Sequence, residues 1–389
     1  MKTTLRILPA IVISQFCCTS LWFAGNAVLN DLMREFDIDR MGLGHLTAAV
    51  QFGFISGTLI FAILTIADRY SPSKVFLFCA VSGALFNLIM LLDQNSLISL
   101  ATSRFMVGFS LAGVYPVGMK IASDHFDKGL GKSLGYLVGA LVLGTAFPHL
   151  VKVITVDSSL PWRWVVILTS VLSLMGGILL FSLVGDGPYR KVSKGFHLNA
   201  FFKVFASGSF RTAAFGYFGH MWELYAFWAF IPFLLEYRNL SIPGSDLNVP
   251  LLSFIIIAVG GLACVIGVYI AREKRVKKVA RTALLISCCC CLLSPFMLQI
   301  PSNTIFLVFL ICWGMAVIAD SPLFSTLVAK NAIAEYRGTA LTIVNCIGFA
   351  ITIVSIQTLN LLQETINPQY LLIFLAFGPV LGLYVLFRK

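Results

Sequence analysis

The feature that most constrains this chain is an internal repeat at an offset of 206 residues. Four features recur at this offset: Gly108 and Gly314, Pro116 and Pro322, Trp22 and Trp228, and the polar stretches at 68–69 and 274–275. One offset that holds along most of a chain predicts two equivalent halves, an arrangement typical of secondary transporters with a substrate site between the halves. We expect these halves at 1–184 and 210–389, joined by a connector at 185–209.

Composition predicts that both halves lie in a membrane. Hydrophobic residues make up 58% of the chain and charged residues 12%, and the mean hydropathy is +0.91. A soluble domain of this length carries more charge. Each apolar segment is long enough to cross about 30 Å of hydrocarbon. We therefore predict an all-α membrane protein of twelve transmembrane helices in two pseudo-symmetric six-helix halves. The predicted spans are 7–30, 43–66, 73–92, 96–120, 131–152, 162–184, 210–235, 250–271, 279–299, 303–327, 338–362 and 369–387.

The distribution of basic residues predicts the topology. Most Lys and Arg side chains lie at the termini or in the even-numbered loops, whereas the first odd-numbered loop is rich in Asp and Glu. The positive-inside rule then places both termini and the connector in the cytoplasm. We expect the protein to lie in the inner (plasma) membrane. The net charge of +11 thus reflects orientation and does not indicate nucleic-acid binding. The strongest basic run, 272–281, is a topology signal or a contact for anionic lipid.

Cysteines predict no disulfide, metal or cofactor site. All ten lie in or at the edges of predicted spans, so they form no extracellular framework. Four consecutive cysteines, 288–291, point about 100° apart on a helix and cannot converge on one ion. We interpret them as small, polarizable core residues.

The segment after the second span resembles a known signature. Ala67-Asp68-Arg69-Tyr70 and Lys74 are similar to the G-x-L-a-D-R-x-G-R motif of the major facilitator superfamily. Leu64 and Ser71 stand where that motif has glycines, and Pro72-Ser73 replace its basic pair. The resemblance implies that Asp68 and Arg69 form a cytoplasmic charge latch. The alternative is an ordinary charged loop with a topology role.

The fourth and fifth spans extend this resemblance. Arg104 to Gly108 matches the family's R-x-x-x-G element. A guanidinium at that depth requires a partner or a wet cavity. The resemblance implies that Arg104 acts in proton coupling or binds an anionic group, whereas its alternative role is to cap neighbouring carbonyls. The glycines of 135–148 form a loose version of the antiporter element, which slightly favours export.

The seventh span holds the sharpest constellation of polar residues. Glu223 falls near the bilayer midplane, and His220 lies three residues earlier on the same helical face. Lipid would reject both side chains, so we expect them to face a central cavity and exchange a proton. The alternative is a buried pair that only locks helices together. Aromatic residues of this span predict a cavity wall: Tyr217, Trp222, Tyr225 and Trp228.

The remaining candidates are scattered over other spans. Asp320, beside Pro322 in the tenth span, is a third intramembrane ionisable group and is assigned to proton coupling. Its alternative is a simple hydrogen bond to a neighbour. Four further residues are predicted to line the substrate cavity: Trp22, Asn26, Gln51 and Asn345. The three polar ones could equally form interhelical hydrogen bonds.

These observations predict a secondary active transporter of a small organic solute. We expect a monomer that works by alternating access and is coupled to protons, with export slightly favoured over uptake. The alternatives are an uncoupled facilitator, a proton-symporting uptake permease and, remotely, a transporter-like sensor or membrane enzyme. No metal-ligand spacing, phosphate-binding loop or nucleophile with a base supports an enzyme. The chain is also similar to porters near the nitrate/nitrite branch, but 43–66 and 250–271 lack that branch's substrate arginines.

Overall fold

The computed structural model describes residues 4–39, 41–126, 130–190, 200–333 and 336–388. Within these residues the chain is nearly all helical and has no strand. It divides into two compact units, Met1–Phe196 and His197–Lys389. Residues 191–199 of the predicted connector lie outside the described part of the chain.

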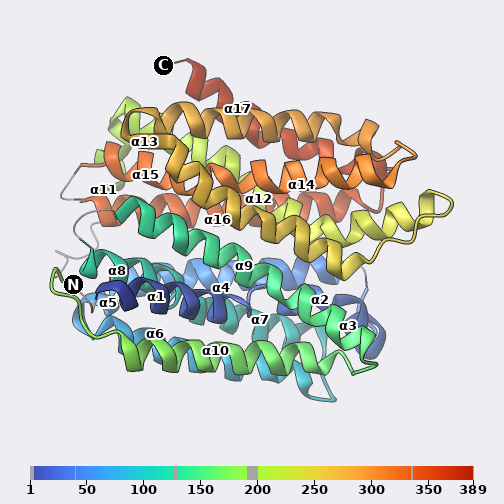
Figure 1. The fold of residues 1–389 in the computed structure, drawn as a ribbon, viewed down its shortest axis with the longest axis horizontal. Helices are drawn as coiled ribbons and strands as arrows, with labels where there is room; N and C mark the ends of the chain where they lie inside the picture. The colour runs from blue at the N-terminus through green and yellow to red at the C-terminus, as the bar shows by residue number, and fades with distance from the viewer. Residues whose placement is uncertain (1–3, 40, 127–129, 191–199, 334–335, 389) are drawn as a thin grey trace. The chain divides into compact units, whose positions relative to one another are not determined.

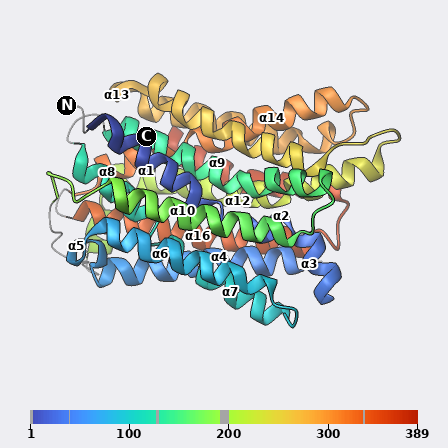
Figure 2. The same ribbon diagram turned by 60° about the horizontal axis from the view of Figure 1, so that its bottom comes forward.

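The first unit holds six predicted spans, several of which are divided into shorter helices (Figure 1). Helices α6 and α10 lie side by side in both views (Figure 2), and α4 packs along α7. The elements are α1 (Thr4–Thr19), α2 (Ala24–Ala27), α3 (Leu29–Phe36), α4 (Gly42–Ile63), α5 (Ile66–Arg69), α6 (Pro72–Leu88), η1 (Ile89–Leu91), α7 (Leu97–Leu111), α8 (Tyr115–His125), α9 (Leu130–Asp157) and α10 (Arg163–Leu183).

The second unit is built around the long helix α12, which packs against α13, α15, α16 and α17. Its elements are α11 (Ala200–Ala206), α12 (Gly208–Ser241), α13 (Val249–Met297), α14 (Asn303–Ala319), α15 (Ser321–Asn331), α16 (Arg337–Leu362), η3 (Pro368–Ala376) and α17 (Phe377–Phe387).

Side-chain caps fix the starts of several spans. The hydroxyl of Ser96 accepts from the backbone N–H of Ser99 at 3.3 Å, and the Ser99 hydroxyl accepts from the N–H of Ser96. The side chains of Ser207, Asn248 and Ser302 each accept one backbone N–H at the starts of α12, α13 and α14. Each cap satisfies an N–H group that has no partner within the helix.

Within the part of the chain that the structure describes, ten helical segments are long and apolar enough to cross a membrane. Many large apolar side chains are exposed on them, for example Phe78 at 72% and Leu262 at 62%. Such exposure suits a surface that contacts lipid. With α1 and the 34-residue α12, these segments correspond to the predicted twelve-helix architecture.

The repeat reappears as a pair of helix breaks. The fourth predicted span divides between Leu111 and Tyr115, and the tenth divides at Asp320. Proline follows each break, Pro116 in α8 and Pro322 in α15, within the first two helical positions where its missing N–H costs nothing. The two breaks therefore occur at equivalent positions of the repeat, directly before the paired prolines.

Two predicted boundaries are wrong. The expected span 7–30 is interrupted at residues 20–23, where the chain forms turns between α1 and α2. The loop expected between spans 250–271 and 279–299 is helical, because α13 continues from Val249 to Met297. Good helix-forming residues such as Arg, Glu and Lys fill this stretch, so polarity alone did not end the helix.

Candidate functional site

Glu223 lies at the meeting point of three helices of the second unit. It belongs to α12 and is 1% exposed. Its Oε1 atom accepts hydrogen bonds from the Ser287 hydroxyl at 2.5 Å and the Trp313 indole N–H at 2.5 Å. The Cys291 thiol donates to the same oxygen at 3.3 Å. Ser287 and Cys291 lie one turn apart on α13 and Trp313 lies on α14, so a single carboxyl oxygen joins three helices.

The Trp313 indole is itself held in place by aromatic packing. The centroid of its ring lies 4.5 Å from the ring centroid of Phe227 and 5.6 Å from that of Phe309. Trp313 is fully buried. The donor is therefore rigid, and the carboxyl group is enclosed by apolar surfaces except along its hydrogen bonds.

His220 and Asp320 form a second buried contact in this unit. Nδ1 of His220 lies 2.8 Å from Oδ1 of Asp320, and both side chains are 1% exposed. Asp320 sits at the break between α14 and α15, which places its carboxyl group toward α12. Within the described residues, Nε2 of His220 and Oδ2 of Asp320 have no hydrogen-bond partner. This pair thus retains donor and acceptor capacity that the protein does not use.

The sequence predicted an exchange between Glu223 and His220, but the structure gives each side chain its own partners. Glu223 bonds to α13 and α14, whereas His220 contacts Asp320. All three ionisable groups nevertheless lie in one unit and converge on α12 and the broken tenth span. At the repeat offset they correspond to Cys17, Ser14 and Val114, so the first unit has no equivalent cluster.

Arg104 is fully enclosed by the first unit. It is 1% exposed, and it donates to the carbonyls of Leu21 at 2.8 Å and Trp22 at 2.5 Å and to Oδ1 of Asn87 at 3.0 Å. The two carbonyls belong to the turns between α1 and α2, where the regular hydrogen-bond pattern of a helix is interrupted. These contacts correspond to the capping role considered for Arg104.

The partner of Arg104 is anchored in turn. Asn87 donates to the carbonyl of Val166 and to the hydroxyls of Thr169 and Ser170, all on α10. This chain of bonds connects the break in the first span to α7, α6 and α10. Helix α12 is continuous at the equivalent position of the repeat, and Leu310 stands at the position equivalent to Arg104.

The predicted cavity residues of the first unit are buried in different environments. Trp22 packs on Phe54, with ring centroids 5.0 Å apart. Asn26 donates to the Thr47 hydroxyl at 2.8 Å, which is an interhelical hydrogen bond. Gln51 is completely buried, and neither polar atom of its side chain has a partner within the described residues.

Other buried side chains of the first unit also carry polar atoms without a partner within the described residues, Gln15 of α1 and Thr145 and His149 of α9 among them. Thr145 and His149 are four residues apart and lie on one face of α9. Periodicity of polar residues in spans one and five was the signal that could have identified this set.

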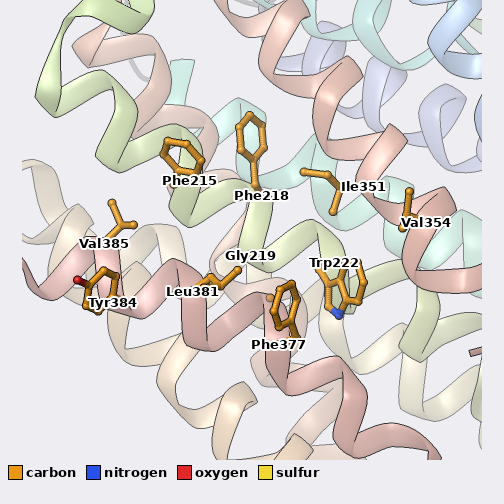
Figure 3. Close-up of a pocket in the computed structure, with 11 residues that line it drawn as sticks. Phe215, Phe218, Gly219, Trp222, Ile351, Val354, Phe377, Leu381, Tyr384 and Val385 are labelled. Carbon is orange, nitrogen blue, oxygen red and sulfur yellow. The ribbon is translucent and has the colours of Figure 1, made fainter. Parts of the chain in front are cut away.

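The predicted wall residues of α12 have different neighbours. Tyr225 packs between Trp228 and Phe349, with both ring centroids 5.3 Å away. Tyr217 is buried against Gly348 of α16. Trp222 instead lines an apolar groove between α12, α16 and α17 (Figure 3). Asn345 is half-buried on α16.

The predicted latch residues have partners within the first unit. Asp68 forms an ion pair with Lys120 of α8 at 2.9 Å, and Lys120 also lies 3.5 Å from Asp124. Arg69 donates to the Thr65 hydroxyl at 3.1 Å. The Arg190 side chain donates to the carbonyls of Asp68 and Tyr70. Lys120 was not among the predicted latch residues, and nothing in its local sequence indicates the contact with Asp68.

Comparison with known proteins decides the family. The sequence profile described as the Major Facilitator Superfamily matches residues 11–356. The chain belongs to the Major Facilitator Superfamily. It is therefore a multi-pass membrane protein of a transporter family and not an enzyme.

One curated relative, the ascochitine biosynthesis cluster MFS transporter of Didymella fabae, is 26% identical over 158 residues. That match covers 40% of this chain, and it spans only 30% of the relative's length. It supports the family assignment over that part of the chain.

Solved structures of superfamily members have the same fold as this chain along nearly all of its length. The human organic anion transporter MFSD10 (TETRAN) has a TM-score of 0.76 at 14% identity, with 98% of this chain and 99% of that chain covered. The proton:xylose symporter XylE has a TM-score of 0.72 at 13% identity, covering 100% and 96%. The nucleoside transporter NupG has a TM-score of 0.72 at 14% identity, covering 98% and 99%.

The superfamily assignment gives the buried groups a chemical context. Within the described residues there is no group of three or more His, Cys, Asp or Glu side chains that could hold a metal ion. Glu223, His220 and Asp320 instead form buried contacts that join α12 to α13, α14 and the break of the tenth span.

Proposed function

We propose that this chain is a secondary active transporter that moves a small organic solute across the plasma (inner) membrane by alternating access, coupled to protons. The buried carboxyl group of Glu223, which joins α12, α13 and α14 through three donors, is the observation that carries this proposal. A charged group at such a depth is costly and is typical of ion pathways. Both termini are taken to lie in the cytoplasm, as the positive-inside rule predicts.

Coupling requires that protonation change the relative stability of two conformations. When Glu223 is ionised, its hydrogen bonds from Ser287 and Trp313 are charge-assisted and hold the three helices together strongly. A proton on Glu223 weakens these bonds. The helices are then free to take up the arrangement favoured in the other state.

The contact between His220 and Asp320 supplies the second element of the mechanism. Asp320 lies at the break of the tenth span, where a change of charge acts directly on the angle between α14 and α15. We assign Asp320, in place of Arg104, to the step that links proton uptake to solute binding. Arg104 has its donors committed to the carbonyls of Leu21 and Trp22.

Buried polar groups of the first unit are the proposed contacts for the solute. Gln15, Gln51, Thr145 and His149 carry polar atoms without a protein partner among the described residues. Leaving such groups unsatisfied costs about 1–3 kcal/mol each, so a solute with matching donors and acceptors is favoured there. Uncharged amides and a hydroxyl suit a polar organic solute better than an inorganic ion.

Proton flux in liposomes tests the proposal. Purified protein is reconstituted with a pH-sensitive dye inside, and xylose, nucleosides, organic anions and organic cations are added in turn. We expect one class to trigger proton movement in the wild type and none in Glu223→Gln, which keeps the size and an acceptor oxygen but does not titrate. Glu236→Gln, near the end of the same helix, is the control and should retain the flux.

The alternatives give different results in the same experiment. Solute movement without any proton flux, equal in the wild type and Glu223→Gln, identifies an uncoupled facilitator and overturns the coupling mechanism. The direction in which solute follows an imposed pH gradient separates export by antiport from uptake by symport. Gln51→Leu should raise the half-saturation concentration of the solute while leaving the ratio of protons to solute unchanged.

A further inference from the structure

The groove between α12, α16 and α17 has a volume of about 430 Å³ and an apolar lining (Figure 3). Its walls come from Phe218 and Trp222 on α12, Val354 on α16, and Phe377 and Leu381 on α17. The indole N–H of Trp222 is occupied, because it donates to the carbonyl of Phe374 at 3.1 Å. The groove thus offers hydrocarbon contacts and very little hydrogen bonding.

Glycines give the groove its depth. Gly219 of α12 and Gly378 of α17 lie at the helix crossing, where a Cβ atom on Gly219 would come within 2.5 Å of the Gly378 carbonyl oxygen. The two helices approach closely there, and large side chains stand on either side of the crossing (Figure 3). This arrangement produces a channel along α17 that extends about 10 Å from Phe377 to Tyr384 at the rise of an α-helix.

The groove opens toward the lipid-exposed surface of the unit. Several lining side chains are half exposed, including Val354 at 56%, Leu381 at 50% and Phe377 at 59%. Such side chains contact hydrocarbon in a membrane, and a flexible chain that enters the groove buries more apolar area than one that lies across it.

One end of the groove is basic. Tyr384 lines the groove, and the guanidinium of Arg388 lies 5.3 Å from the centre of its ring. One turn further along α17, the guanidinium of Arg281 lies 4.5 Å from the ring of Phe387. Among the residues that the structure describes, neither arginine takes part in an ion pair. Aromatic rings hold both cations in place without neutralising them.

We propose that this groove is a binding site for one acidic phospholipid. An acyl chain lies in the groove between α12 and α17, and the phosphate group lies at Arg281 and Arg388. An acidic phospholipid combines the two required features, a long apolar chain and a net negative head group. A zwitterionic lipid has the same chain, but its own cation opposes the two guanidinium groups. The site rests on membrane insertion alone and does not depend on proton coupling.

Quenching of tryptophan fluorescence by brominated lipid tests this site, because Trp222 forms one wall. The full-length protein is reconstituted in nanodiscs of phosphatidylcholine that contain a small fraction of either dibrominated phosphatidylglycerol or dibrominated phosphatidylcholine. The signal of Trp222 is the difference between the wild type and Trp222→Phe. We expect the acidic lipid to reach half-maximal quenching at a lower fraction than the zwitterionic lipid, by roughly fivefold for each arginine that contributes.

Variants at the basic end and in the groove complete the test. The double substitution Arg281→Gln and Arg388→Gln should abolish the preference, whereas Lys330→Gln on α15 removes one charge elsewhere in the unit and should retain it. Val354→Phe should reduce quenching by the acidic lipid, because it fills the groove without changing any charge. Equal quenching by the two lipids in the wild type overturns the proposal. A preference that survives in the double variant also overturns it, since the head group is then bound elsewhere.

Discussion

Gly108 and Gly314, which occupy equivalent positions of the repeat, make the same helix contact in their respective units. A Cβ atom on Gly108 would overlap the carbonyl oxygen of Val50, and one on Gly314 would overlap that of Ile256. Val50 and Ile256 are themselves separated by the repeat offset. Each glycine lets two helices approach until no side chain fits between them. The internal repeat is therefore a repeat of backbone packing.

The close approach at Gly314 predicts a large effect of a single methyl group. In Gly314→Ala the new Cβ meets a backbone carbonyl, which cannot rotate away, so α14 must move relative to α13. We expect a loss of about 1–3 kcal/mol in stability. Thermal unfolding of the purified protein in detergent measures this loss. Gly338→Ala is the matched control, because no atom lies within 4 Å of its added Cβ and alanine favours the helix. Equal melting temperatures for the two variants would contradict the packing argument.

Arg104 is predicted to be required for stability of the first unit. Arg104→Leu installs the residue found at the equivalent position of the second unit, but it leaves the carbonyls of Leu21 and Trp22 without a donor. An unsatisfied buried group costs about 1–3 kcal/mol, so we expect a clear drop in melting temperature. Leu310→Met, a volume-conserving change in the second unit, should alter it little. A stable Arg104→Leu protein that fails to transport would show instead that Arg104 acts on the solute or the proton.

Particular residues show what the sequence predicted and why the rest was out of reach. The twelve-helix fold followed from apolar segments and the repeat, because a membrane leaves few alternatives to helices. The breaks before Pro116 and Pro322 were not predicted, although the pairing of these prolines in the repeat was visible. The burial of Glu223, His220 and Asp320 agrees with the placement of these groups inside the spans.

Side-chain partners could not be predicted in the same way. Whether His220 contacts Glu223 or Asp320 depends on where the tenth span breaks and how α12 is rotated, and neither is encoded in local spacing. Cys291 was interpreted as core filler, yet its thiol donates to Glu223. The turn at residues 20–23 was missed because its sequence is mostly apolar, and Arg104, on another helix, donates to its Leu21 and Trp22 carbonyls.

The cluster around Glu223 predicts unequal effects of two serines on α13. Ser287→Ala removes a donor to the buried carboxyl oxygen, and hydrogen bonds to charged groups contribute about 1.5–3 kcal/mol. We expect reduced stability and altered proton coupling in the liposome experiment. Ser294→Ala, two turns away, removes only a hydroxyl bonded to the carbonyl of Cys291. It should leave coupling intact, and identical behaviour of the two variants would exclude Ser287 from the mechanism.

The ion-pair cluster at Lys120 predicts that Asp124→Asn has opposite effects on stability in the wild type and in Lys120→Ala. Lys120 lies between Asp68 at 2.9 Å and Asp124 at 3.5 Å, and the side chains are 20%, 14% and 7% exposed. Removing the cation in Lys120→Ala leaves two carboxylates close together, so we expect a loss of about 1–2 kcal/mol, less than for a fully buried pair.

Adding Asp124→Asn to Lys120→Ala removes one of the two carboxylates that repel each other, so it should recover part of the lost stability. In the wild-type background the same substitution breaks an attraction and should lower stability. Thermal or denaturant unfolding of the four proteins gives the coupling free energy between Lys120 and Asp124. Lys120→Arg keeps the charge and serves as the control. If Asp124→Asn has the same effect in both backgrounds, the two residues do not interact, and Lys120 then acts through Asp68 alone.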